Sequence, residues 1–238
     1  MQKQPITTLP NDTGGITKYG LQRRNMLKFA GASAALIVVG SACNKNDNPS
    51  NGGIDLGSGD VGILNYAYAL EQLEAAFYTQ VVATPYSGIS ALESEYLTDI
   101  RNHEVAHREF FKAAITAAAP TAIIPGLQVN FSSINFASRD SVLATAMAFE
   151  DLGVSAYNGA GQLISSSASG KVYLGLAGKI VSVEARHAAL IRDLISNGTF
   201  ANTTDTNGLD TPVRTPAQVL AIASAYLTTK LDASHLPS

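Results

Sequence analysis

The sequence predicts an all-α fold: a four-helix bundle of two antiparallel helix pairs joined by a long crossover, plus a short C-terminal helix. Apolar residues recur at three- and four-residue steps in four long segments, which is the periodicity of amphipathic helices. The connections between these segments are unequal, because two are short and the middle one has 18 residues and two prolines. Short connections join antiparallel neighbours, whereas 18 extended residues can run the length of a bundle.

Each helix is expected where the apolar periodicity is bounded by residues that cap or break helices. Asp60 can cap the first helix, and Pro85 and Pro120 follow the first two. Asn197-Gly198 can close the fourth in a left-handed turn, and Thr215-Pro216 can start a fifth. The expected ranges are 60–83, 90–119, 138–165, 171–196 and, for the short C-terminal helix, 215–230.

The N-terminal region has the composition of an export signal. Before Cys43 there are five basic residues and one acidic residue, and the run 29–42 is uncharged. That run is too short to span a bilayer but suits the apolar part of a signal. The string QRRNMLK, which starts at Gln22, resembles a twin-arginine signal, and an ordinary secretory signal is the alternative. Residues 1–42 are therefore predicted to direct export.

Cys43 is the single cysteine, so the chain can form no internal disulfide. It follows Gly40-Ser41-Ala42, which resembles a bacterial lipoprotein cleavage site, although a large aliphatic residue is usual where Gly40 stands. We expect membrane attachment through lipidated Cys43, in the periplasm or cell envelope. Residues 43–59 are rich in Asn, Gly, Ser and Asp and predict a flexible tether. The bundle then spans 60–197, and a C-terminal extension spans 198–238.

Composition and charge argue against a nucleic-acid partner. Hydrophobic residues make up 46% of the 238 residues, which is enough for a packed core. Charged residues make up only 15%, and the chain after Cys43 carries 11 basic and 18 acidic residues. This excess of acidic residues predicts that the domain has no basic surface to bind the phosphates of a nucleic acid.

A repeated pattern links the two predicted helix pairs. The strings LEQLEAAFY, from Leu70, and FEDLGVSAY, from Phe149, each place a tyrosine seven residues after a glutamate. The second and fourth helices each contain E-x-x-H, whose two side chains share one helix face. Counting residues from the turns places all four glutamates near mid-bundle. The predicted site consists of Glu71, Glu104, His107, Glu150, Glu184 and His187.

The string HEVAH, which begins at His103, also matches the H-E-x-x-H pattern of zinc proteases. The second half has Val183 at the position of His103, so the repeat retains only E-x-x-H. A protease would need a third ligand, yet no histidine follows until His187 and no acidic residue follows Glu109 before Asp140. We therefore reject the protease interpretation and expect His103 at the surface or beside a metal ligand.

The six predicted site residues suit two metal ions. Four carboxylates offer four negative charges to two divalent cations, and each histidine can cap one ion. Carboxylate oxygens with imidazole favour iron, with manganese as a second fit and zinc as a poorer one. Without metal, four buried acids would repel one another and some would hold protons.

These residues carry a resemblance to a known family. Residues 60–196 resemble the ferritin-like superfamily, and the signal peptide with the strings LEQLEAAFY and HEVAH is most similar to exported ferritin-like domain proteins, which include desiccation-related proteins. The resemblance implies that the six residues bind two irons. It also implies that Tyr78 and Tyr157 are core tyrosines hydrogen-bonded to metal ligands, with a catalytic redox role as the alternative. Glu74 is either a ligand in one metal state or a hydrogen-bond acceptor beside the ligands.

The resemblance leaves the activity open, because superfamily members oxidise ferrous iron, reduce peroxide, oxygenate substrates or have no proven catalysis. No Cys-x-x-Cys pair is present, which excludes a rubredoxin-like module. We expect Fe(II) oxidation or the handling of oxygen or peroxide. The alternative is a non-catalytic envelope protein for stress protection or binding, in which the metals are structural. A hollow storage cage fits a tethered lipoprotein poorly, whereas a homodimer is compatible with it.

Overall fold

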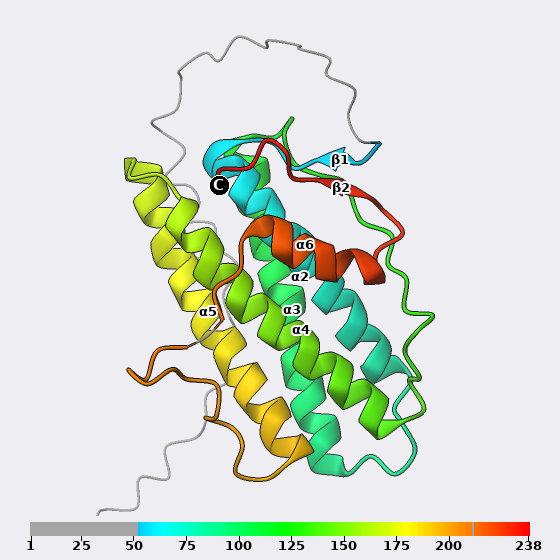
Figure 1. The fold of residues 1–238 in the computed structure, drawn as a ribbon. Helices are drawn as coiled ribbons and strands as arrows, with labels where there is room; N and C mark the ends of the chain where they lie inside the picture. The colour runs from blue at the N-terminus through cyan, green and yellow to red at the C-terminus, as the bar shows by residue number, and fades with distance from the viewer. Residues whose placement is uncertain (1–51, 211) are drawn as a thin grey trace, which may run out of the picture.

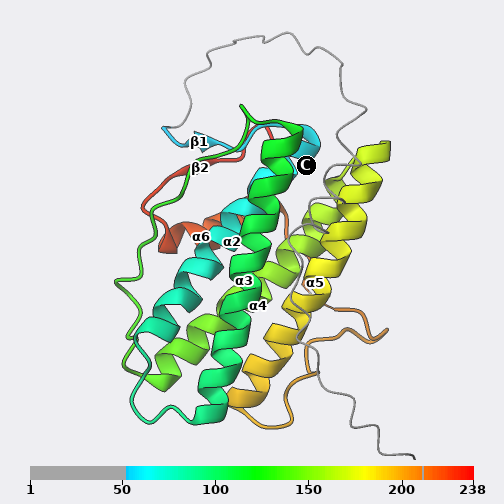
Figure 2. The same cartoon turned by 180° about the vertical axis from the view of Figure 1, so that it is seen from behind.

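The computed structural model describes residues 52–210 and 212–238, and these residues form the predicted helical bundle (Figure 1). Helices α2 (Gly59–Ala83) and α3 (Ala91–Ala118) make one antiparallel pair, and α4 (Arg139–Ala160) and α5 (Ala168–Ile195) make the other. Figures 1 and 2 show the α3–α4 connection running along the outside of the bundle from one end to the other. The predicted export signal, Cys43 and residues 44–51 of the tether lie outside the described residues.

Helix α2 is the most extensively buried of the four bundle helices, and two of its polar side chains hold the crossover against it. Asn65 donates a hydrogen bond from Nδ2 to the carbonyl of Ala122 at 2.7 Å. Gln72 accepts one on Oε1 from the backbone N–H of Leu127 at 2.9 Å. Both side chains are buried, so these bonds satisfy polar groups that burial would otherwise leave unpaired. The crossover therefore covers α2 and completes its burial.

The turn between α4 and α5 differs from the sequence prediction. Helix α4 was expected to reach Ser165, but it ends at Ala160 and continues as the short 3₁₀ helix η1 (Gly161–Leu163). Asp60 was expected to cap α2, yet it lies within the first turn, after Ser58 at the N-cap. Its carboxylate instead accepts hydrogen bonds from the backbone N–H and hydroxyl of Ser165, each at 2.7 Å. Asp60 therefore ties the start of α2 to the α4–α5 turn.

The C-terminal extension returns to the end of the bundle where α2 begins. Helix α6 (Pro216–Ala223) starts with the predicted cap, in which Thr215 and Gln218 form a capping box. With η2 (Ser224–Tyr226) the helical segment ends before the expected residue 230. Strand β2 (Leu231–Asp232) then pairs in parallel with β1 (Ile54–Asp55). Leu56 is fully buried beside this pair, so the packed part of the chain begins before residue 60, within the segment predicted as tether.

A close approach between α4 and the extension requires Gly159. A β-carbon at this position would overlap the carbonyl oxygen of Arg214, a backbone atom that cannot turn away. The approach is held by the Arg214 side chain, which donates from Nη1 to the hydroxyl of Ser155 at 2.8 Å.

Gly159→Ala is therefore expected to lower the free energy of unfolding by about 1–3 kcal/mol, the usual range for overpacking. Gly175→Ala is the matched control, because the exposed α5 position has open space around the added methyl group. The control is expected to stabilise the helix by about 0.5–1 kcal/mol. Urea unfolding midpoints of the two variants measure the difference, and equal midpoints would contradict the packing argument.

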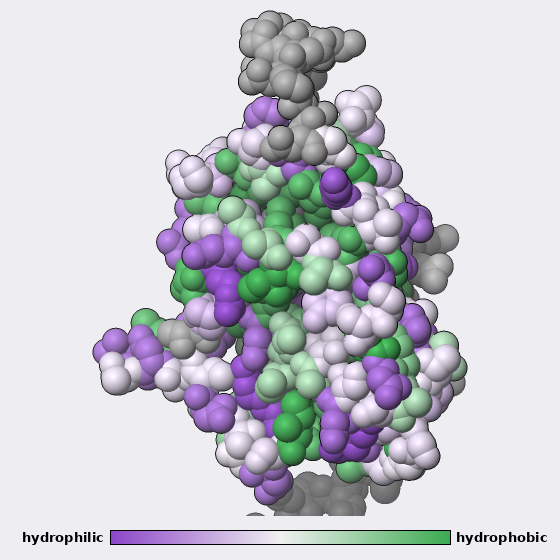
Figure 3. Space-filling view, turned by 45° about the vertical axis from the view of Figure 1, so that its right-hand side comes forward, coloured by the Kyte–Doolittle hydropathy of each residue, from purple (hydrophilic) through white to green (hydrophobic). Residues whose placement is uncertain are grey.

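The surface does not present one continuous apolar area on the face shown in Figure 3, where hydrophobic residues are interrupted by hydrophilic ones. Large hydrophobic side chains are exposed at scattered positions, such as Leu92 on α3 and Phe200 after α5. Isolated exposed side chains of this kind are normal for a folded domain. Among the described residues, no helix has the length and apolar character needed to cross a bilayer.

Candidate metal centre

The structure brings all six predicted site residues together in the interior of the bundle. Each of the four helices contributes at its middle: α2 and α4 one glutamate each, and α3 and α5 one glutamate and one histidine each. The four glutamates are fully buried, His187 is 4% exposed, and the side chain of His107 is 12% exposed. Burial of this many acids in a low-dielectric interior is unfavourable unless positive charge compensates it.

The six residues form two overlapping groups, each with the geometry to hold a metal ion. One group contains Glu71, Glu104, His107 and Glu184, and the other contains Glu104, Glu150, Glu184 and His187. Within each group, one potential ligand atom per residue lies within 4.8 Å of the others. Glu104 and Glu184 belong to both groups. The two groups therefore overlap at two shared carboxylates.

Each histidine approaches the shared glutamate of the other helix pair, so that His107 of α3 meets Glu184 of α5 and His187 of α5 meets Glu104 of α3. Nδ1 of His107 lies 2.8 Å from Oε1 of Glu184, and Nδ1 of His187 lies 2.9 Å from Oε1 of Glu104. These contacts are within ion-pair distance, but neither nitrogen has a partner with hydrogen-bond geometry. Both nitrogens therefore face the carboxylates without being satisfied by them.

The unsatisfied atoms show that the site fits bound cations. Eight side-chain oxygen and nitrogen atoms of the six residues are buried without a hydrogen-bond partner. Most buried polar atoms in proteins are hydrogen-bonded, so this concentration at one place needs an explanation. Cations bound between the residues would satisfy these atoms at once. The donor set of four carboxylates and two imidazoles is the one used by dimetal carboxylate bundles.

The metal-free site has strongly shifted protonation equilibria. Burial lowers the pKa of both histidines, but the surrounding glutamates outweigh it and raise the pKa of His107 and of His187 to about 12. Burial raises the pKa of Glu150 to about 8, despite the contact with His187. Burial also acts to raise the pKa of Glu104, but His107 and His187 lower it to about 2. Protons thus take the place of cations in neutralising the metal-free site.

The metal-free protein is accordingly expected to lose stability as the pH rises from about 4.5 to 8. The folded state holds a proton on Glu150 that the unfolded chain has already released, and its histidines likewise keep theirs above pH 6.5. Each proton that only the folded state holds lowers the free energy of unfolding by about 1.4 kcal/mol for every unit by which the pH rises. Urea unfolding in the presence of a chelator at pH 5.5 and pH 8 measures the trend.

Metal-loaded protein is the control for this pH dependence, because ligation requires deprotonated groups and opposes the loss of stability. Its free energy of unfolding is expected to be constant or to rise over the same interval. A metal-free protein that became more stable towards pH 8 would contradict the assignment of a protonated carboxyl to the folded site.

Two tyrosines cross-link α2 and α4 through the site. Tyr78 of α2 donates a hydrogen bond to Oε1 of Glu150 on α4 at 2.5 Å. Tyr157 of α4 donates one to Oε1 of Glu71 on α2. The structure thus places both tyrosines in the predicted position, with their hydroxyls on candidate ligands. Each bond also leaves the second oxygen of its glutamate free to face the metal positions.

His103 lies at the exposed edge of the site and contacts only one of the two histidines. Its Nδ1 is 2.9 Å from Nε2 of His187, and the two rings are stacked with centroids 5.2 Å apart. His103 belongs to neither metal group, as expected once the protease pattern is rejected. Its contact engages the ring nitrogen of His187 that faces away from the glutamates. A partner of this kind orients a metal-binding histidine.

The structure also reveals two features near the site that were open or missed in the sequence. Glu74 is buried at 4% exposure but belongs to neither group. Gly153 of α4 lies against it and was not singled out from the sequence. The signal was present in the repeat, since Gly153 follows Glu150 by the same three positions by which Glu74 follows Glu71.

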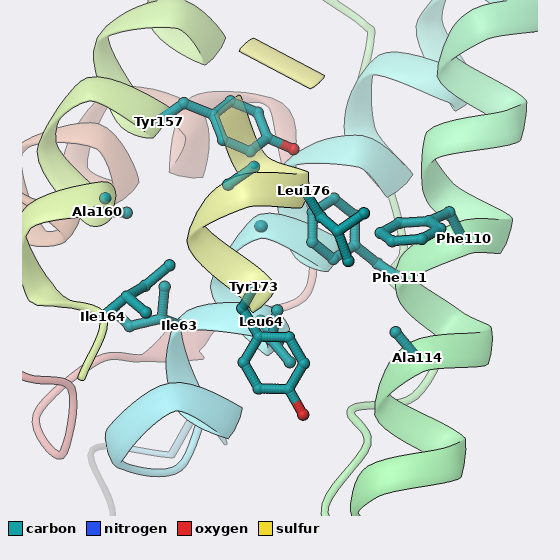
Figure 4. Close-up of a pocket in the computed structure, with 13 residues that line it drawn as sticks. Ile63, Leu64, Phe110, Phe111, Ala114, Tyr157, Ala160, Ile164, Tyr173 and Leu176 are labelled. Atoms are coloured by element: carbon teal, nitrogen blue, oxygen red, sulfur yellow. The ribbon is translucent and has the colours of Figure 1, made fainter. Parts of the chain in front are cut away.

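An apolar pocket adjoins the site on the side of Glu71 and His107. Figure 4 shows it between Tyr157 of α4, Phe110 and Phe111 of α3 and the first turns of α2. Its walls include Ala67, one turn before Glu71, and Phe111, one turn after His107. The cavity has a volume of about 30 Å³, and its lining is almost entirely apolar.

Comparisons with known proteins identify the family. The family described as Ferritin-like domain matches residues 59–197, which is more than half of the chain and covers all four bundle helices. A comparison with curated proteins gave no match. The match spans both helix pairs and the crossover between them, in agreement with the fold and with the buried carboxylate and histidine cluster. The chain therefore belongs to the ferritin-like domain family.

Proposed function

We propose that the protein binds two iron ions at the six-residue site and oxidises Fe(II) with dioxygen or peroxide. The observation that carries this function is the pair of overlapping ligand groups, each with three carboxylates and one histidine, that share Glu104 and Glu184. Two iron ions held there would supply two electrons, which with two protons convert dioxygen to hydrogen peroxide or hydrogen peroxide to two waters.

The charge of the site supports a pair of divalent ions. Four ionised carboxylates and two neutral histidines carry four negative charges, which two divalent cations neutralise. Carboxylate-rich sites with one imidazole per metal suit iron and manganese better than zinc, which favours thiolate and imidazole ligands. Iron is the ion in this set that changes oxidation state most readily with dioxygen, so we take it as the resident metal.

The apolar pocket beside the site supports dioxygen as the oxidant. A cavity of about 30 Å³ has room for a molecule of two or three heavy atoms. Its lining offers almost no hydrogen-bond partners, so it favours dioxygen over the more polar peroxide. The pocket reaches Tyr157, whose hydroxyl is bonded to Glu71, so a molecule in it lies next to the residues around one metal position.

Tyr78 and Tyr157 orient the two unshared glutamates in this proposal. Each hydroxyl engages one carboxylate oxygen and leaves the other for metal. A redox role for the same tyrosines is the alternative, and Fe(II) oxidation by phenylalanine variants separates the two roles. A phenylalanine variant that binds two metals and still oxidises Fe(II) has lost only an orienting bond.

Elemental analysis combined with Fe(II) oxidation kinetics tests the function. Purified protein is expected to bind two iron ions per chain and to consume dioxygen or peroxide in proportion to the Fe(II) added. Glu104→Gln protein is the control, since it removes a carboxylate common to both groups without changing side-chain size. Protein that remains metal-free after exposure to iron would refute the proposal.

Bound metal without any turnover would instead support the second function, a non-catalytic envelope protein for stress protection or binding. The observation that favours this alternative is the burial of the whole site, since a pair of cations would neutralise its charges whether or not they react. The two functions therefore make the same prediction for metal content and opposite predictions for Fe(II) oxidation.

We further propose that the protein is exported and attached to a membrane through Cys43, in the periplasm or cell envelope. The support is the twin-arginine-like string and the small residues before Cys43. Cell fractionation of the wild-type and Cys43→Ala chains tests this, because only the wild-type chain is expected in the membrane fraction.

A further inference from the structure

A second cavity, which has no role in the proposed function, lies between the bundle and the C-terminal extension, and we call it the extension cleft. Its volume is about 280 Å³, compared with about 30 Å³ for the apolar pocket beside the metal centre. Within the described part of the chain, none of its lining residues belongs to the six-residue site or to that pocket. The extension cleft therefore needs an explanation that does not involve the metal centre.

The inner wall of the extension cleft is formed by the α4–α5 pair. Val154 of α4 and Ala185 and Ala188 of α5 supply small or aliphatic side chains. Beside them, Arg192 of α5 donates a hydrogen bond from Nη2 to Oδ1 of Asp151 on α4. The Asp151 side chain of this ion pair is 32% exposed. The inner wall thus combines an apolar floor with a paired donor and acceptor.

The outer wall of the extension cleft is a turn that stands away from the bundle beside α5 (Figures 1 and 2). Thr204 and Asp210 pair as an antiparallel bridge across the turn. Between them, the Asp205 carboxylate accepts hydrogen bonds from the backbone N–H groups of Asn207 and Leu209 at 2.7 and 2.9 Å. These bonds give the wall a defined shape, which lowers the cost of ordering it around a ligand.

Arg214 holds the far end of the outer wall against α4. Its backbone N–H donates to the carbonyl of Ser155 at 3.1 Å, and its Nη1 donates to the hydroxyl of the same residue at 2.8 Å. A guanidinium has five N–H donors, and the side-chain bond uses one of them. The polar residues that the outer wall contributes to the lining are Thr203, Thr204, Asp210 and Arg214.

The charges of the extension cleft balance one another. Its charged lining residues are two arginines, Arg192 and Arg214, and two aspartates, Asp151 and Asp210. Burial raises the pKa of Asp151, while Arg192 and Arg214 act to lower it and Asp210 acts to raise it, so the four groups are close enough to interact. An ion of either sign would compete with the existing ion pair. A hydroxyl group both donates and accepts, so it can bind a carboxylate and a guanidinium without displacing either.

Phe200 adds an exposed aromatic face to this polar lining. Its side chain is 58% exposed, and it lines the cleft together with the four charged residues. Leu209 and Val213 of the same segment are exposed to a similar extent but do not line the cleft. A sugar ring carries C–H groups on its faces and hydroxyls around its edge. It therefore matches an aromatic face that lies next to hydrogen-bonding groups.

The volume of the extension cleft is enough for one hexose ring. It equals the volume of about nine water molecules in the liquid, at about 30 Å³ each. We infer that the extension cleft binds a neutral hexose, whose hydroxyls contact the arginines and aspartates and whose ring packs on Phe200. This inference depends neither on metal binding nor on Fe(II) oxidation, and it gives the C-terminal extension a role of its own.

An NMR titration of the full ¹⁵N-labelled chain with sugars tests this site. The probes are glucose, galactose, mannose and N-acetylglucosamine, each added separately. At least one sugar is expected to give saturable shifts of the amide signals of Phe200, Thr203 and Thr204, which line the cleft. Absence of such shifts with all four sugars would overturn the inference, whatever the protein does with iron.

Phe200→Ala tests the aromatic face with the sugar that binds best. The variant is expected to weaken binding about two- to tenfold, the usual range for the loss of an aromatic packing partner. Leu209→Ala is the matched control, because Leu209 is 63% exposed in the same turn and lies outside the lining, and it is expected to bind as wild type. Equal affinities of Phe200→Ala and wild-type protein would overturn the placement of the sugar in the cleft.

Asp210→Asn tests the polar lining independently. The change is expected to weaken binding of the same sugar about fivefold, because a neutral amide accepts hydrogen bonds from hydroxyls more weakly than a carboxylate does. Asp140→Asn, at an exposed position of α4 outside the lining, is the control and is expected to have no effect. Circular dichroism shows whether each variant keeps its helices.

Charged probes separate a sugar site from a site for ions. Acetate, methylammonium and leucine offer an anion, a cation and a zwitterion, and none of them is expected to give saturable shifts of the same signals. Saturation by one of these three probes, with no response to the sugars, would overturn the assignment of a neutral ligand.

Discussion

Glu104→Gln protein is expected to retain neither metal ion under conditions in which Glu71→Gln protein retains one. Both glutamates are fully buried, and both substitutions remove one negative charge without changing side-chain size. Glu104 belongs to both ligand groups, so its loss leaves each metal position with three ligands. Glu71 belongs to one group only, so the position formed with Glu150 and His187 remains complete.

The measurement is the metal content per chain after exchange into a buffer that contains a weak competing chelator. Wild type is expected to keep two ions, Glu71→Gln and Glu150→Gln one each, and Glu104→Gln and Glu184→Gln none. Equal metal content in the Glu71 and Glu104 variants would show that the two groups do not act as two positions. Helix content of the metal-free variants, measured by circular dichroism, excludes unfolding as the cause.

Removal of metal by a chelator is expected to lower the melting temperature by about 10–20 °C. Each ion at a free concentration of 100 times its Kd contributes about 2.7 kcal/mol to the stability of the folded state. Two ions together correspond to about 5 kcal/mol, and each kcal/mol shifts the Tm of a domain of this size by about 2–4 °C. The physical reason is the cluster of buried carboxylates, which repel one another when no cation lies between them.

The control for this experiment is Glu104→Gln protein, whose Tm is expected to be the same with and without chelator. Thermal unfolding followed by circular dichroism measures both proteins in parallel. A wild-type Tm that does not change on chelation would mean that the site binds no ion tightly enough to stabilise the fold.

The repeat made most of the fold and the six site residues predictable from the sequence. Glu104 follows Glu71 by 33 positions and Glu184 follows Glu150 by 34, and these nearly equal spacings place the four acids at about one height, because helices rise by a constant amount per residue. The start and end of α2 and α3 were also predicted within one residue. Proline after each of these helices gave a clear local signal for where it stops.

The features that the sequence did not reveal depend on contacts between distant residues. Helix α4 was predicted too long because the 3₁₀ turn after Ala160 has nearly the same local pattern as a helix. Asp60 looked like a cap, but its tertiary contact with Ser165 decides its position. Helical spacing gives the height of Tyr78 but not the helix that its hydroxyl reaches. The pairing of β1 with β2 has no local sequence signal at all.

The parallel pairing of Ile54–Asp55 with Leu231–Asp232 has a consequence for the order of folding. These strands lie far apart in the described chain, so their backbone hydrogen bonds cannot form until residues 230–232 have left the ribosome. The four helices can pair earlier, because their contacts are mostly with the next helix along the chain. The β1–β2 pair beside Leu56 therefore forms after the helices have paired. A nascent or truncated chain that lacks residues 231–232 would expose Leu56 and this end of the bundle to chaperones and proteases.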